Sequence, residues 1–591
     1  MADSKTPSTN ADQLITEHLD IWTTAIEQKS SSGRGSSKKF SLHGIKKLRE
    51  LILELAVRGK LVPQDPKDSS PQQALRGSID KKEALINDGV IKRSRSKKNI
   101  KDEHFYSYPS SWSTARLEEL LNVINGRAYK KAEMLTSGTP ILRVGNLFTS
   151  NDWYYSDLQL EPEKYIDDGD LIYAWSASFG PFIWNGGKVI YHYHIWKMDI
   201  YSEIALDKNF SKLFLAAISE RIKASGNGIA MIHMTKERME KVIHPLPPIE
   251  EQQRIVAKVD ELMNLCDVLE AQTENSIAAH QTLVEVLLEA LLKAPEQGAT
   301  PEQATTQFQQ NWQRLSEHFD TLFTTTASID TLKQTILQLA VMGKLVPQNP
   351  NDEPAAKLLE RIAAEKAQLI KDKKIKKQKP LPEITDEEKP FELPKGWEWV
   401  NLGELVTIRG GKRLPKGQVL SRQVTPYIYI RVSDMRNGSI REDDLHYITE
   451  DVQSQISNYI ITTDDLYMTI VGATIGKCGL IPIRFNGMNL TENAARLTPF
   501  IGVDKYYLFK YLDSDFAQEQ FFDKTKQVGV QKMALNRLST TKVPLPSVEE
   551  QRRIVTKVDE LMALCDQLKA SLTDAQTTKL HLTDAIVEQA L

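Results

Sequence analysis

The residues most able to do catalytic or metal chemistry lack the partners that such chemistry needs. The segment GATIGKC from Gly472 approaches a phosphate-binding loop, but it has one residue too few before Gly-Lys and no Ser or Thr to hold magnesium. His192 and His194 would share one face of a strand. Without a clustered third ligand, two histidines more often flank a core than bind a metal. These residues predict neither a nucleotide site nor a metal centre.

Other catalytic signatures are missing from the sequence as well. It has no Asn/Asp-Pro-Pro-aromatic tetrapeptide of the amino-methyltransferase type, and no G-x-G-x-x-G, G-x-S-x-G or H-E-x-x-H. The segment PEITDEEK lies in a lysine-rich tract, where a solvated charge run explains it better than a nuclease motif. Cys266, Cys478 and Cys565 form no C-x-x-C pair, and we expect Cys266 and Cys565 to be small core residues. We predict that this chain is not an enzyme and binds no metal or cofactor.

Basic and amide side chains gather in glycine-containing loops of two stretches that differ from each other. Sequence readout of DNA needs Arg or Lys for guanine and Asn or Gln for adenine, surrounded by phosphate contacts. A solvated surface charge is the simpler interpretation for any single residue. The candidates from these loops are Arg127, Tyr129, Lys130, Lys131, Arg143, Asn146, Arg409, Lys412, Arg413, Lys416, Arg431, Ser433 and Arg436.

Composition constrains how these loops could act. The 591 residues carry a net charge of −3, with 41% hydrophobic and 26% charged residues, as in a soluble globular protein of several domains. A near-neutral chain has no general attraction to nucleic acid, so any contact must come from local basic surfaces. No apolar stretch is long enough to span a membrane and the N-terminus is polar, so we expect a cytoplasmic protein.

The elements that must position these loops occur twice. PLPPIEEQQRIVAKVDELMNLCDVLEA from Pro245 returns as PLPSVEEQRRIVTKVDELMALCDQLKA from Pro544, with 20 of 27 positions identical. Apolar residues alternate at spacings of four and three, which predicts a long helix with a coiled-coil seam after each Pro-Leu-Pro. The first seam weakens at Thr273 and Ser276 and is expected to resume at Leu283 and Leu287. The second falters at Lys579 and is expected to resume at Leu582 and Ile586. The seam residues are Ile255, Val259, Leu262, Cys266, Leu269, Ile554, Val558, Leu561, Cys565 and Leu568.

A second phrase is repeated earlier in each half: LRELILELAVRGKLVPQDP from Leu48 and LKQTILQLAVMGKLVPQNP from Leu332. Each predicts a short helix capped by Gly59 or Gly343 and followed by an extended segment. Lysine-rich tracts follow from Ile91 and from Lys371, which we interpret as solvated linkers, with non-specific phosphate contact as the alternative. SSSGRGSSK from Ser30 and APEQGATPEQATTQ from Ala294 are predicted to be flexible linkers.

The two stretches of about 130 residues before each Pro-Leu-Pro share only a short opening and then diverge. Runs such as VIYHYHIW and TPYIYIRVSD, separated by turn signals, predict compact β-rich domains. The repeated frame therefore makes the same contacts twice, whereas the divergent inserts meet two different surfaces.

This arrangement resembles the specificity subunit of Type I restriction-modification enzymes, from about Leu48 to Leu591, and the AV-x-GKLVPQ phrase resembles the Type IB group. The resemblance implies an α+β fold: two β-rich target-recognition domains joined by two long antiparallel coiled-coil helices, with pseudo-two-fold symmetry from a tandem duplication. It adds Asn227, Gln531, Lys532 and Asn536, in polar loops near the domain exits, as DNA-binding candidates. The expected parts are 1–104, an N-terminal repeat helix and basic linker; 105–248, the first recognition domain; 249–293, the central helix; 294–391, a linker, the second repeat helix and the Lys-rich tract; 392–546, the second recognition domain; and 547–591, the C-terminal helix.

The same resemblance implies the partners. Each recognition domain would read one half of an asymmetric bipartite DNA site, and the helices would set the spacing and dock two modification subunits. S-adenosylmethionine would act in those methyltransferase subunits, and ATP and Mg in restriction subunits that translocate and cleave DNA. The alternative is a two-lobed coiled-coil adaptor whose inserts bind proteins; a mobility-shift assay with DNA separates the two.

Overall fold

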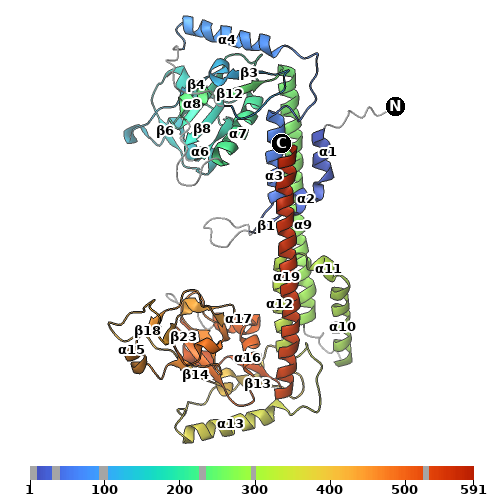
Figure 1. The fold of residues 1–591 in the computed structure, drawn as a ribbon, viewed down its shortest axis with the longest axis vertical. Helices are drawn as coiled ribbons and strands as arrows, with labels where there is room; N and C mark the ends of the chain where they lie inside the picture. The colour runs from blue at the N-terminus through green and yellow to red at the C-terminus, as the bar shows by residue number, and fades with distance from the viewer. Residues whose placement is uncertain are drawn as a thin grey trace. The chain divides into compact units, whose positions relative to one another are not determined.

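A computed structural model describes residues 10–28, 40–91, 104–176, 178–224, 235–293, 301–523 and 532–591. The chain falls into two compact units, residues 1–276 with 575–591, and residues 277–574. Each unit combines helices with one β-rich domain (Figure 1). In the described part of the chain, no helix is long and apolar enough to cross a membrane.

Two long helices follow the repeated Pro-Leu-Pro segments, α9 (Ile249–Leu292) and α19 (Val548–Ala590). Each begins with two glutamates, which favour the positive end of the helix dipole. The predicted seam residues turn inward together. Those that are buried are Ile255, Val259, Leu262, Cys266, Ile554, Val558 and Cys565; those that are half-buried are Leu269, Leu561 and Leu568.

Each seam resumes one residue later than predicted, whereas Ile586 further along α19 is buried as predicted. Leu283 is 50% exposed, and the next residue, Val284, is buried instead. In α19, Leu582 is 44% exposed and Thr583 is buried. An ideal helix drifts relative to a strict seven-residue repeat, so a seam interrupted by polar residues can resume on a shifted stripe.

The short repeated helices pack beside the long ones within each unit. In the first unit α3 (His43–Val57) lies beside α9, and the Arg49 guanidinium donates to Asp267 at 2.7 Å and to Glu270 at 2.8 Å (Figure 1). In the second unit α12 (Thr326–Val341) lies beside α19, and Lys569 donates to Asp330 at 2.6 Å. The repeated sequence therefore builds the same helix pair twice.

Both short helices end at a glycine, as predicted. Gly59 and Gly343 have φ of 70° and 69°, in the left-handed region that side chains avoid. A Cβ on Gly59 would lie 2.6 Å from the ring of Pro109, and one on Gly343 would lie 2.5 Å from that of Pro394. Only glycine fits where the helix end meets the opening of each β-rich domain.

The remaining helices outside the β-rich domains were not predicted, and one of them corrects a linker prediction. Residues 301–307 of the predicted linker from Ala294 are helical, within α10 (Pro301–Glu317). Leu315 of this helix is buried in a cluster with α12 and α19, which gives the segment an apolar anchor. The Ser30 linker and most of the first lysine-rich tract lie outside the described residues. The other unpredicted helices are α1 (Asn10–Glu17), α2 (Leu19–Thr24), α4 (Pro71–Asn87), α11 (Phe319–Leu322) and α13 (Ala355–Lys371).

The β-rich domain of the first unit, here called the first insert domain, contains two four-stranded sheets. One is antiparallel; the other contains a parallel pair, β5 with β10. Their strand orders are β4(Leu121–Asn125)-β11(Ile195–Ile200)-β8(Leu171–Ser176)-β9(Ser178–Ile183) and β6(Tyr154–Ser156)-β5(Thr139–Leu142)-β10(Val189–Tyr191)-β7(Tyr165–Ile166). Strands β3 (Ser113–Arg116) and β12 (Ile243–Leu246) pair where the domain opens and closes, and helix α7 (Lys208–Ala224) lies against β9.

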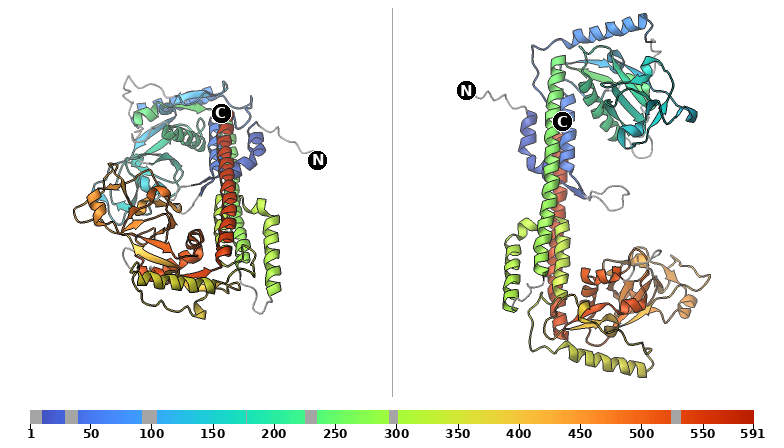
Figure 2. Two further views of the ribbon diagram at one scale, coloured as in Figure 1. Left: turned by 60° about the horizontal axis from the view of Figure 1, so that its bottom comes forward. Right: turned by 180° about the vertical axis from the view of Figure 1, so that it is seen from behind.

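The second insert domain repeats this order strand for strand, although its sequence has diverged. Its sheets are β14(Val406–Gly410)-β23(Ala494–Pro499)-β20(Leu466–Thr469)-β21(Cys478–Leu480) and β18(Tyr447–Ile448)-β15(Tyr427–Ile430)-β22(Met488–Leu490)-β19(Ile460–Ile461). Strands β13 (Glu398–Asn401) and β24 (Lys542–Leu545) pair at its opening and close, and a small hairpin, β16 (Met435–Arg436) with β17 (Ser439–Ile440), is added. Helix α13 contributes Leu358 and Ile362 to the domain core and lies along its edge (Figure 2).

One buried tryptophan fastens each insert domain to its long helix. The Trp112 Nε1 donates to Glu251 at 3.1 Å in α9, and the Trp397 Nε1 donates to Glu550 at 2.9 Å in α19. Burial raises the pKa of Glu251 to about 7 and also raises that of Glu550. The two halves thus use the same attachment.

Candidate nucleic-acid interface

Two equivalent glycines place the first candidate loops against the parallel strand pair of each insert domain. A Cβ on Gly126 would lie 2.3 Å from the carbonyl oxygen of His192, and one on Gly411 would lie 2.1 Å from that of Thr491. Both loops can pass so close only because these residues lack side chains. The following residues, Arg127 and Lys412, therefore occupy the same position in the two domains.

Arg127 is held inside its own loop. Its guanidinium donates to both carboxylate oxygens of Glu133, at 3.1 and 2.7 Å, and this pairing lowers the pKa of Glu133. A bidentate pair of this kind fixes the geometry of the loop. The neighbouring side chains of Lys130 and Lys131 are exposed, so the cations this loop offers outward are these two lysines.

Tyr129 does not have the role predicted for it. Its side chain is 9% exposed and packs with Ile141 and Ile190, and its hydroxyl contacts the carbonyl of Tyr191 at 3.4 Å. Burial raises its pKa to about 12. The ring packs between the loop and the sheet, because burying its apolar face in the core is more favourable than exposing it to solvent.

Arg143 and Asn146 cap the short helix α6 (Val144–Phe148). The Asn146 amide accepts from the backbone N–H of Arg143 at 3.1 Å and donates to the carbonyl of Asp152 at 2.8 Å. The guanidinium of Arg143 also donates to Asp152, at 2.7 Å, and lies over the ring of Tyr154 at 4.3 Å. Both side chains shape this loop, and the Asn146 amide donates only within it, to the carbonyls of Ser150 and Asp152.

Arg431 occupies the equivalent position in the second insert domain, directly after β15. Its guanidinium donates to Asp434 at 2.6 Å and to Asp444 at 3.0 Å, and it is 23% exposed. Arg431 lowers the pKa of Asp444. Ser433 contacts Asp434 as well, at 3.3 Å. As in the first domain, the arginine that follows the parallel strand forms its hydrogen bonds within its own loop.

The loop after Gly411 presents more cations to solvent. Arg413 is 81% exposed and pairs with Glu492 at 2.8 Å, and the Lys412 ammonium lies 5.5 Å from the ring centroid of Tyr459. Lys416 is exposed in the same loop, and Arg436 is exposed in the added hairpin. These side chains can reach a polyanion without first breaking a buried contact.

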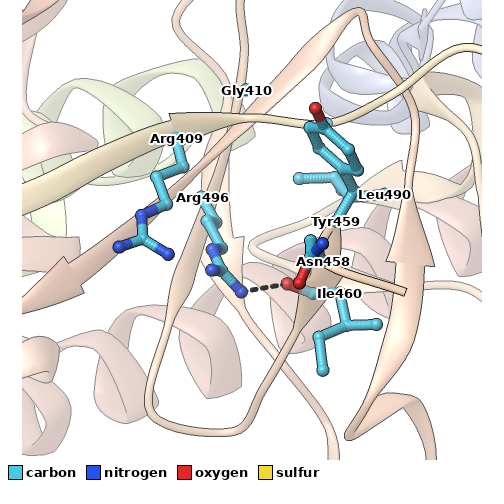
Figure 3. A pocket seen from close by; sticks show the side chains of 8 residues that line it. Arg409, Gly410, Asn458, Tyr459, Ile460, Leu490 and Arg496 are labelled. Atoms are coloured by element: carbon cyan, nitrogen blue, oxygen red, sulfur yellow. Dashed lines mark hydrogen bonds between the residues drawn. The ribbon is translucent and has the colours of Figure 1, made fainter. Parts of the chain in front are cut away.

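Arg409 lies in β14, the strand that precedes this loop. Its neighbour across the sheet is a residue that the sequence did not single out. Arg409 lies directly opposite Arg496 of β23, and both line a pocket of about 250 Å³ with Asn458 and Tyr459 (Figure 3). Arg496 donates to the carbonyl of Ile460. Sequence spacing could not pair residues 409 and 496, because only the strand register brings them together.

The candidates near the domain exits divide into two groups. Asn227 and Gln531 lie outside the described residues. Lys532 forms an antiparallel bridge with Val471 and is exposed, and Asn536 is exposed on α18 (Leu535–Ser539).

Two histidines of the first insert domain, His192 and His194, belong to an aromatic cluster. The rings of His192 and His194 lie 4.9 Å apart, and Trp175 packs against His194 at 5.1 Å. Burial and the neighbouring His194 lower the pKa of His192 to about 4. Among the described residues, no group of three His, Cys, Asp or Glu could hold a metal ion. Tyr193, 40% exposed, gives this loop an aromatic surface, a type of side chain that stacks on bases.

The fold and these surfaces define a protein with two β-rich recognition domains on a duplicated helical frame. Comparison with known proteins identifies the family. The Type I restriction modification DNA specificity domain matches residues 109–279 and 394–575. The chain belongs to this family.

Known members of the family match over the whole length. The chain is 37% identical to the Type I restriction enzyme EcoAI specificity subunit of Escherichia coli, over 98% of this chain and 100% of that protein. It is 34% identical to the EcoEI specificity subunit of Escherichia coli, over 98% and 99%. A chain from a structure of the complex assembly of the type I R-M system covers 82% of this chain and 98% of its own, at 17% identity and a TM-score of 0.46. The predicted specificity-subunit fold and function are confirmed, and the protein-adaptor alternative finds no support.

Proposed function

We propose that each insert domain reads one half of an asymmetric, bipartite DNA site, and that this chain supplies sequence recognition without catalysis. The observation that carries this proposal is the pairing of one strand order with two sets of exposed side chains. Lys130, Lys131 and Tyr193 face outward from the first domain, whereas Lys412 and Arg413 lie at the equivalent loop of the second. One fold with two surfaces suits a target whose halves differ, where two identical readers would need a palindrome.

The duplicated frame supports a proposal for the partners. The Trp112–Glu251 and Trp397–Glu550 attachments give each unit the same join between helix and insert domain. A second matching ion pair links Arg254 to Asp68 at 2.6 Å and Arg553 to Asp352. Two equivalent surfaces can dock two copies of one partner. We propose that these are two modification subunits, in which S-adenosylmethionine is the methyl donor, and that restriction subunits use ATP and Mg. We place the complex in the cytoplasm.

Selection from random duplexes tests the proposal. The full chain, in complex with the subunits that co-purify with it, is incubated with a random duplex pool, and the bound DNA is sequenced. We expect two short specified blocks separated by an unspecified gap of fixed length. A single continuous block, a palindrome, or no enrichment would contradict two dissimilar readers.

A further inference from the structure

The second insert domain places two arginines directly opposite each other on neighbouring strands. Arg409 of β14 and Arg496 of β23 are register partners, and both line the pocket in Figure 3. Like charges directly opposite each other destabilise a sheet. Burial, and to a smaller extent the charge of Arg409, lowers the pKa of the Arg496 guanidinium. The free protein therefore holds an unfavourable pair of cations here.

Neither guanidinium forms an ion pair within 4 Å in the described part of the chain. Arg409 donates to the backbone carbonyl of Lys374 at 2.9 Å, and Arg496 donates to that of Ile460. The charge of Asp465 raises the pKa of Arg496 and opposes the effect of Arg409, but this single carboxylate lies more than 4 Å from both guanidinium groups and accepts hydrogen bonds from Thr462 and Thr498. Neutral carbonyls orient the two guanidinium groups without cancelling their charge.

The first insert domain neutralises the equivalent position. Lys197 stands where Arg496 stands, and its register partner is the apolar Ile124. The Lys197 ammonium donates to Asp170 at 2.7 Å and is 17% exposed, so one cation meets one anion. The shared fold therefore does not require an unneutralised pair. The second domain has a second cation there, and Asp465, which precedes β20 as Asp170 precedes β8, forms no ion pair within 4 Å among the described residues.

We propose that the pocket of Arg409 and Arg496 binds one phosphodiester group of the DNA backbone. A phosphate supplies the missing negative charge and accepts charge-assisted hydrogen bonds from both guanidinium groups. A base edge is neutral and would leave the two charges uncompensated. Arg409, Asn458 and Tyr459 are exposed at the pocket, so a DNA strand can reach it. This inference rests on the proposed function, because it takes DNA as the ligand.

The salt dependence of DNA binding tests the inference. Dissociation constants are measured for the full chain, in complex with its co-purifying subunits, on a duplex carrying the selected target and on a scrambled duplex. We expect R409Q and R496Q each to weaken binding to both duplexes about tenfold. We expect the slope of log affinity against log salt to fall by about 0.9, the change expected when one phosphate is no longer neutralised. The matched control is R484Q, which removes an exposed cation of the same domain that pairs with Glu442.

The outcomes separate this inference from the proposed function. Unchanged slopes in R409Q and R496Q would overturn the phosphate site, and so would an effect confined to one base pair of the target. A wild-type complex that binds neither duplex would instead contradict the proposed function.

Melting temperatures show whether the R409Q variant is correctly folded. In chloride buffer R409Q should melt at or above the wild-type temperature, because the substitution removes repulsion. Inorganic phosphate at matched ionic strength should raise the melting temperature of the wild type and not that of R409Q. A lower melting temperature for R409Q in chloride, or equal stabilisation of both proteins by phosphate, would overturn the inference.

Discussion

The two insert domains have the same strand order and different polar chemistry at matched positions. Lys197 and Asp170 form an ion pair in the first domain, whereas Arg496 faces Arg409 in the second. His244 of β12 is buried in the first domain, and the matched residue of β24 is Val543. The apolar alternation that builds the sheets has been kept while the polar residues have changed. A fold of this kind tolerates new surface and edge chemistry, because its register depends on the buried faces.

The contacts between each domain and its long helix show the opposite behaviour. Tryptophan, glutamate and the neighbouring Arg–Asp pair are the same in both halves. The comparison therefore separates a duplicated attachment from two independent surfaces. The following predictions test each side of it.

The largest expected effect comes from removing the attachment. Trp112→Ala and Trp397→Ala should each lower the free energy of unfolding of their unit by about 3–5 kcal/mol, because a large buried ring is removed and a buried carboxylate loses its donor. Urea unfolding followed by circular dichroism measures this. Trp312→Ala, at a ring that is 42% exposed, is the control and should change little. A cost in one half only would break the equivalence of the two attachments.

Acid should weaken the first insert domain through His244. Burial lowers the pKa of this histidine to about 4, below its ordinary value of 6.5. The folded state thus favours the neutral ring of His244. With respect to this group, the protein keeps its full stability above pH 6.5, where the ring is neutral in the folded and unfolded states, and loses stability as the pH falls towards 4. The loss should reach about 3 kcal/mol.

His244→Val, which copies Val543 of the second domain, tests this contribution. Thermal melts of both proteins are compared at neutral pH and at acid pH. We expect the melting temperature of the wild type to fall further on acidification than that of the variant, because the wild type must charge one more buried ring, that of His244. A variant that loses stability on acidification as steeply as the wild type would refute the prediction.

The Lys197 ion pair should contribute less. Asp170→Asn leaves a largely buried ammonium without its carboxylate, and we expect a cost of about 2 kcal/mol, reduced from that of a fully buried pair by the remaining exposure. Asp465 of the second domain accepts hydrogen bonds from two hydroxyl groups and one backbone N–H, and it has no ion pair within 4 Å among the described residues, so Asp465→Asn should cost less. Chemical denaturation of both variants gives the comparison. Equal costs would show that the two sites do not differ in charge pairing.

The smallest effect on stability is expected at the exposed lysines of the first domain. Lys130→Gln with Lys131→Gln should leave the melting temperature unchanged within about 1 °C, since neither side chain is buried. The same variant should bind DNA with a lower salt slope. A lower melting temperature without a change in slope would assign these lysines to the fold and not to the DNA surface.

Local periodicity could predict the helical frame, but not the chemistry of the inserts. The seam from Ile255 to Leu269 follows from spacing along one helix. Arg496 matters because of its partner across two strands, and a pairing between residues 409 and 496 leaves no local signal. Tyr129 lies in a predicted loop, where an exposed side chain was expected, yet its ring is buried against the sheet. Leu315 anchors a helix whose polar composition had suggested a linker.

Exchange of one domain tests the central claim most directly. Residues 113–244 are replaced by the corresponding segment of a related specificity subunit, and methylated bases are mapped in DNA exposed to the assembled complex. We predict that one half of the recognised sequence changes while the other half and the gap stay the same. A change in both halves, or in neither, would contradict two independent readers on a duplicated frame.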